Sequence, residues 1–153
     1  MNRALSPVVG VVSLVAITVV LAASVGLVVS GSATADPAPQ ATLSLSADAA
    51  TDRVVLTHES GETLSTTALT VRITVDGEPL EHQPPVPFFA ATGFRGGPSG
   101  PFNPATDPGW TAGERAAVRL ASTNAPLLDE GSTVGVTIST DGAVVADLET
   151  EAE

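Results

Sequence analysis

The sequence contains no cysteine, no lysine and only two histidines. The lack of cysteine excludes disulfide bonds, cysteine-bound metals, thiol catalysis and a lipoprotein anchor, so an extracellular domain would depend on its packing alone. His58 and His82 are not spaced as metal ligands, for example as H-x-x-x-H. No Asn-x-Ser/Thr sequon is present either, which excludes N-glycosylation through that motif. We therefore expect no cofactor and no metal.

Motifs for catalysis are also missing. Ser99 resembles the serine of a nucleophile elbow only superficially, because Pro101 stands where the second glycine of that motif belongs. His58 precedes Glu59 at a predicted strand end, where a histidine in a turn or facing solvent is far commoner than a catalytic base. The sequence therefore predicts that the protein is not an enzyme.

Charge is distributed unevenly along the 153 residues, which are enough for one domain and a short appendage. Arg3 is the only charged residue before Asp36, so residues 36–153 hold five arginines against 17 acidic residues, a formal charge of −12. An acidic surface repels phosphate backbones, so no nucleic-acid partner is expected. The arginine-only, carboxylate-rich usage resembles that of haloarchaeal proteins, in which carboxylates keep the surface hydrated in molar salt. An acidic protein from a high-GC organism of ordinary salinity is the alternative.

The N-terminal segment is uncharged from residue 4 to residue 35, and it is almost continuously apolar from Val8 to Ser30. As a helix rising 1.5 Å per residue, Val8 to Ser30 would extend about 35 Å, enough to cross a hydrocarbon core about 30 Å thick. It exceeds the roughly 7–15 apolar residues of a removable secretory signal. With Arg3 before it and acidic residues after it, the segment predicts a single-pass membrane helix with the C-terminal bulk outside the cell.

Local signals give this helix its expected ends. Ser6 can act as an N-cap and Pro7 suits the first helical position, while Gly31 is a plausible stop. We therefore expect a helix over 5–31 and a linker over 32–40, followed by an acidic domain over 41–153.

The order of residues in this segment is more specific than its hydrophobicity. The stretch from Arg3 to Val12 and the Val-Ala-Ile-Thr-Val run from Val15 closely resemble the N-terminal signature of archaeal type IV pilins, especially haloarchaeal ones. The resemblance implies cleavage between Ala4 and Leu5 by a prepilin-peptidase-like membrane protease, which makes residues 1–4 a leader. The residues that form the leader and helix-start motif are Arg3, Ser6, Pro7, Val8, Val9 and Gly10.

The resemblance also implies what the helix does after cleavage. Such helices are held in membrane lipid before assembly and then bundle with other pilin subunits in the core of an extracellular filament, often with a role in surface adhesion. A helix that is apolar on every side must be buried in lipid or among other helices. Ala22 and Gly26 form a small-xxx-small pair that permits close helix approach.

Two alternatives compete with a filament subunit. Ala33-Thr34-Ala35 is an acceptable A-x-A site for ordinary signal peptidase, which would release residues 36–153 as a secreted binding domain. The other alternative is a single-span envelope protein that has a pilin-like leader but never polymerises.

From Ala41 onwards the hydrophobic period changes to two, which indicates half-buried strands. Asp76-Gly77 and Asp141-Gly142 are tight-hairpin signals. The expected fold class is therefore α+β, with one long hydrophobic N-terminal helix and a small antiparallel β-sandwich. The alternating apolar positions are Leu43, Leu45 and Ala47; Leu69, Val71, Ile73 and Val75; Val118 and Leu120; Val134, Val136 and Ile138; and Val144, Ala146 and Leu148.

Three short stretches, residues 57–64, 110–114 and 128–131, also resemble turns of haloarchaeal pilin C-terminal domains. A segment rich in Pro and Gly, residues 81–113, lies between the hairpins and holds every aromatic side chain. The rings either fold back over an otherwise aliphatic core or form an exposed surface for adhesion or subunit contact. These residues are Phe88, Phe89, Phe94, Phe102 and Trp110.

Overall fold

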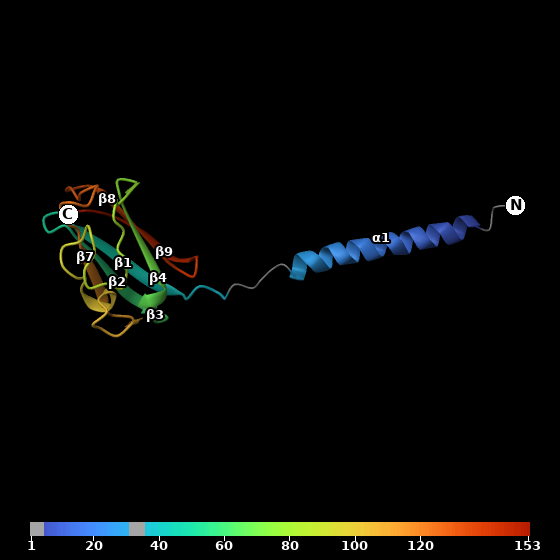
Figure 1. Ribbon diagram of the computed structural model, residues 1–153, viewed down its shortest axis with the longest axis horizontal. Coiled ribbons are helices and arrows are strands. Elements are labelled where there is room, and N and C mark those ends of the chain that lie inside the picture. Colours follow the sequence, from blue (N-terminus) through green and yellow to red (C-terminus); the bar gives the residue numbers. More distant parts are fainter. Residues whose placement is uncertain (1–4, 31–35) are drawn as a thin grey trace. The chain divides into compact units, whose positions relative to one another are not determined.

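The computed structural model describes residues 5–30 and 36–153. The chain divides into two compact units, Met1–Pro37 and Ala38–Glu153 (Figure 1), and each is described here by itself. The first contains the helix α1 and the second contains antiparallel sheets. The expected α+β class is therefore confirmed.

Helix α1 extends over Leu5–Ser30, within one residue of the predicted 5–31. Pro7 lies in the first turn, where its missing N–H needs no partner. Inside the helix, the Thr18 hydroxyl donates to the carbonyl oxygen of Leu14 at 2.8 Å. The sequence also predicted that this helix spans a membrane. Among residues 5–30 and 36–153, no helix is both long and apolar enough to do so.

The second unit is built from nine strands and two short 3₁₀ helices. Three sheets form, with strand orders β1-β2-β7, β5-β4-β8-β9 and β3-β6. The strands are β1 (Ala41–Asp48), β2 (Arg53–Gly61), β3 (Leu64–Ser65), β4 (Leu69–Val75), β5 (Glu78–Pro79), β6 (Gly109–Trp110), β7 (Arg115–Arg119), β8 (Thr133–Thr140) and β9 (Ala143–Glu151), and the 3₁₀ helices are η1 (Thr66–Ala68) and η2 (Gly100–Phe102).

The two larger sheets pack on one hydrophobic core, as expected for a β-sandwich. Alternation along the strands explains this arrangement, because every second residue of β4 and β8 is buried, including Val71, Ile73, Val136 and Ile138. The sheets also meet at one end of their outer strands: the Glu153 N–H donates to the Ala47 carbonyl oxygen at 3.1 Å. The chain terminus thus joins β1 to the end of β9.

Four of the predicted turns are present, and in the fifth, over 57–64, only residues 62–63 bend, between β2 and β3. Asp76-Gly77 and Asp141-Gly142 connect β4 to β5 and β8 to β9, and all four residues have positive φ. Two-residue hairpin turns require that conformation. The predicted turns over 110–114 and 128–131 are also present. Residues 57–61, however, continue β2 rather than forming a turn, because Val54, Leu56 and His58 alternate inward as one strand.

The segment over 81–113 has little regular structure but is held by side-chain amides. The Asn124 side chain is almost completely buried, accepts the His82 N–H at 3.0 Å, and donates to the His82 and Gly93 carbonyls at 3.0 and 3.1 Å. Gln83 bonds both the N–H and the carbonyl of Ile73, at 2.7 and 2.9 Å. Because these amides satisfy the backbone in place of strand pairing, the segment is ordered without a long strand.

Candidate interaction surfaces

The surface of α1 is apolar on every side in the part of the helix whose side chains are described, residues 7–23. At 100° per residue, its large side chains point in all directions around the axis, and no polar stripe separates them. Each is between 54 and 69% exposed. These residues are Val8, Val9, Val11, Val12, Leu14, Val15, Ile17, Val19, Val20 and Leu21.

Small residues interrupt this apolar surface. Ala22 lies on α1 as predicted, while the side-chain environment at Gly26 lies outside the described part of the helix. The structure adds a shallow hollow of about 250 Å³ lined by Ala16, Ile17 and Leu21 together with Val20. Ala16 was not among the predicted helix-packing residues, although a small residue among large apolar ones is a signal for such a hollow.

The motif at the start of the helix is only partly described. Arg3 and Ala4 lie outside the described residues, and Leu5 is the first residue of α1. Gly10 is within the helix, and no atom lies within 4 Å of where a Cβ would be placed. No contact among the described residues therefore requires glycine at that position.

The aromatic side chains of residues 81–113 lie mostly in the core. Phe88, Phe94, Phe102 and Trp110 are buried, with Trp110 completely inaccessible, whereas Phe89 is 65% exposed. The Phe102 and Trp110 rings meet edge to face at 5.2 Å, and Phe88 contacts Phe94 at 5.4 Å. The prediction of an exposed aromatic surface is therefore wrong for four of the five residues. Their rings fill the space beneath this segment, which the aliphatic side chains of the sheets alone do not fill. Only Phe89 is available at the surface.

His58 was predicted to lie in a turn or face solvent, and that prediction is wrong. It points inward from β2 and is completely buried, because it continues the inward alternation of Val54 and Leu56. Its Nδ1 lies 3.0 Å from the Trp110 carbonyl oxygen and its Nε2 lies 3.1 Å from the Ser60 carbonyl oxygen. The ring also meets Trp110 edge to face at 5.7 Å. Both ring nitrogens therefore contact backbone carbonyl oxygens and stabilise the fold.

Other polar groups of the described residues also serve the fold. Glu114 accepts hydrogen bonds from the Thr111 N–H at 2.7 Å and the Thr111 hydroxyl at 2.8 Å, and these bonds to the ionised form lower the pKa of Glu114. The carboxylate closes the turn between β6 and β7. Within 5–30 and 36–153, no group of three or more histidine or acidic side chains is placed to hold a metal ion.

Comparison with known families agrees with the resemblance at the N-terminus. Residues 3–43 match the model of a family described as archaeal type IV pilin, N-terminal. The match covers the helix-start motif, all of α1 and the first residues of β1. No curated protein matches the chain.

Proposed function

We propose that this protein is a structural subunit of an archaeal type IV pilus-like surface filament that assembles through α1. The main support is the surface of the helix: large apolar side chains point outward in every direction, and the same segment matches the archaeal type IV pilin family. Leaving such a surface in water would cost about 25 cal/mol for each Å² of apolar area. Neighbouring helices of the same kind remove this cost by covering all sides.

The small residues of α1 suit this packing. Gly10 has open space around it, and Ala16 is at the bottom of a hollow that a large side chain of a neighbouring helix can enter. Close approach of helices depends on such small side chains. Ala22 and Gly26 would add a second place of close approach.

Processing and location follow the same proposal. A prepilin-peptidase-like membrane protease would cut between Ala4 and Leu5, and the subunit would be held by membrane lipid until it joins an extracellular filament with other pilin subunits. The acidic β-domain would then face outward, where its carboxylates keep it hydrated in the high salt of a halophilic habitat. A role in adhesion would fall to this domain, whose exposed Phe89 is one contact point.

Incorporation into filaments tests the role of the helix. Val12→Asp places a charge on α1, and we expect it to abolish incorporation, because an ionised carboxylate among packed apolar helices costs several kcal/mol. Thr123→Asp, on an exposed loop of the β-domain, adds the same charge and should leave incorporation unchanged. Sheared filaments and membranes are compared by immunoblot. Equal incorporation of both variants would refute assembly through α1.

The same fractions distinguish the two alternatives. A wild-type chain found in membranes but absent from sheared filaments would indicate a non-polymerising envelope protein. A chain found in the medium outside filaments, and beginning at Asp36, would indicate a secreted binding domain.

A further inference from the structure

Four of the five arginines of the β-domain lie around one outer face of the sandwich. Arg53 is exposed next to the buried Val54 of β2, and the exposed Arg115 and Arg119 are the two end residues of β7, next to the buried Ala116 and Val118, so these side chains point away from the core. Arg95 lies beside them, since its N–H donates to the Arg119 carbonyl oxygen at 2.8 Å. We call Arg53, Arg95, Arg115 and Arg119 the arginine face.

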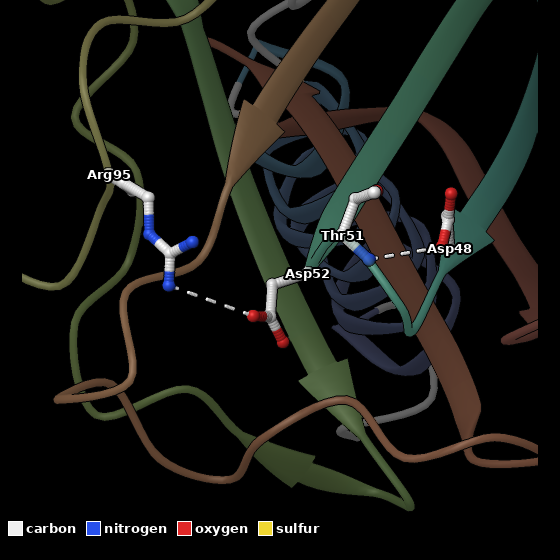
Figure 2. Close-up of polar contacts among 4 residues, drawn as sticks. All are labelled: Asp48, Thr51, Asp52 and Arg95. Carbon is white, nitrogen blue, oxygen red and sulfur yellow. Dashed lines mark hydrogen bonds and ion pairs between the residues drawn. The ribbon is translucent and has the colours of Figure 1, made fainter.

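Acidic residues also lie on and around the arginine face, including Glu59 on the same outward side of β2, whose carboxylate accepts the Ser44 hydroxyl at 2.5 Å. Only Arg95 forms an ion pair within the described residues, with Asp52 at 4.0 Å (Figure 2). Asp48 is opposite Arg53, but its Oδ1 accepts the Thr51 N–H at 3.1 Å, as Figure 2 also shows.

Two of the arginines are also placed next to each other. Arg53 and Arg119 are direct cross-strand partners, and like charges in that position are destabilising unless a counter-charge is supplied. The half-buried Val55 and the buried Ala117 form the next pair along the two strands, so no further charge separates Arg53 and Arg119 from Arg115.

The outer face of the other sheet has the opposite charge. Asp147, Glu149 and Glu151 alternate outward along β9, directly across from Thr137, Gly135 and Thr133 of β8. We call Asp147, Glu149 and Glu151 the acidic face. Arg72, the only arginine on this sheet, also points outward, across Thr137 from Asp147, so three carboxylates share this face with one arginine.

A hollow lies within the acidic face, because Gly135 has no side chain. It has a volume of about 400 Å³ and is lined by Thr74, Asp76, Thr133 and Glu149. A second hollow of about 170 Å³ adjoins it beside Asp147. Asp147 and Glu149 are two residues apart on one strand, about 7 Å, and Arg53 and Arg119 on adjacent strands are about 5 Å apart. The two spacings differ by about 2 Å, which the long arginine side chains can span.

We propose that the β-domains of two copies of this chain dock by the arginine face of one on the acidic face of the next. Guanidinium groups match carboxylates in geometry and charge, and arginine is the basic residue suited to such contacts. The two sheets share one core, so their outer faces point in opposite directions. The contact is therefore heterologous and leaves a free face at each end, as an open filament requires. This contact rests on the proposed function, and it makes a second copy of this chain the partner of the β-domain.

Engineered cysteines test this contact, because the natural chain has none. Thr57→Cys is on the arginine face beside Arg115, and Thr74→Cys lines the hollow of the acidic face. Full-length chains with each substitution are expressed together and oxidised on the cell surface. We expect a disulfide-linked pair of the two variants and at least about tenfold less of it when Thr57→Cys is paired with Glu130→Cys, on a turn outside both faces.

A charge exchange then separates electrostatic matching from simple proximity. Arg53→Glu with Arg119→Glu in the Thr57→Cys chain should lower the cross-linked yield about tenfold or more, because it replaces ion pairs in direct contact, within the roughly 3 Å over which molar salt leaves charges unscreened, by like charges. Asp147→Arg with Glu149→Arg in the Thr74→Cys chain should restore it. Absence of a cross-link in the unexchanged pair, or no recovery after the exchange, would overturn the proposal.

Failure of this contact can be distinguished from failure of the proposed function. Filaments that contain both cysteine variants without the disulfide would overturn the face-to-face contact and leave assembly through α1 intact. The disulfide without filaments would support the contact and refute the filament subunit. Neither filaments nor disulfide would overturn both.

Discussion

Truncating Phe102 tests whether the aromatic side chains of residues 81–113 form the core of the β-domain. The Phe102 ring is 1% exposed and meets the Trp110 ring edge to face. Phe102→Ala should therefore lower the free energy of unfolding by about 3–5 kcal/mol, the usual cost of deleting a buried phenylalanine ring. Phe89→Ala removes the same atoms from a side chain that is 65% exposed, and it should change stability by no more than about 0.5 kcal/mol.

Trp110 provides the assay. It is the only tryptophan and the chain has no tyrosine, so fluorescence excited at the indole reports on the β-domain alone. With a urea slope of about 2 kcal/mol per M, Phe102→Ala should shift the unfolding midpoint of the full chain in mild detergent down by roughly 2 M. If this variant does not fold, Phe102→Leu keeps most of the volume and should cost less than about 1.5 kcal/mol.

The reasoning would be refuted if Phe89→Ala shifted the midpoint as much as Phe102→Ala. It would also be refuted if Phe102→Ala left the midpoint where it is in the wild type. Either result would mean that the segment over 81–113 does not belong to the folded core.

Three further predictions concern single sites. His58→Phe should destabilise the domain although it adds apolar surface, by about 1–3 kcal/mol, because the carbonyl oxygen that accepts the imidazole N–H is left without a donor; equal midpoints in urea would contradict this. Because the pKa of Glu114 is lowered, its stabilising effect is complete above the unfolded-state pKa and is lost as pH falls through the folded-state pKa. The difference in thermal midpoint between wild type and Glu114→Gln should therefore shrink on acidification, and a constant difference would argue against it. Gly100→Ala would place a Cβ 1.9 Å from the Arg115 carbonyl oxygen, so it should lower the thermal midpoint much more than Gly113→Ala, where φ is also positive but the space is open. If both variants lowered the midpoint equally, the positive φ rather than the close contact would account for the loss.

The strands of the sandwich could be predicted because their local signals agree. Alternation in β4 and β8 placed the buried residues correctly, and both Asp-Gly pairs form the expected turns with positive φ. In β9 the alternation failed: Val144 is 59% exposed, and Ala146 and Leu148 are only half-buried. The pairing with β8 shifts register between Ile138 and Ser139, which breaks the simple alternation. In β2 the sequence 57–64 is polar enough to resemble a turn, and the inward position of His58 depends on the carbonyls of Trp110 and Ser60. Those partners come together only in the folded domain.

Of the interaction surfaces, too, some could be predicted from the sequence and others could not. The apolar helix and its similarity to the N-terminal segment of archaeal type IV pilins follow from residues 3–30 alone, since both depend on local order. The burial of four aromatic rings and the separation of arginine from acidic faces depend on which strands become neighbours. Strand order is set by contacts between residues far apart in the sequence, such as the pairing of β2 with β7. Local patterns in a single sequence therefore do not predict it.

The mature N-terminus of the chain in sheared surface filaments tests the central claim most directly. Filaments are purified and the subunit's first residues are read by Edman degradation or mass spectrometry. The account predicts that the chain is present and begins at Leu5, with α1 complete. A chain that is absent from the filaments, or that begins at Asp36 without α1, would contradict it.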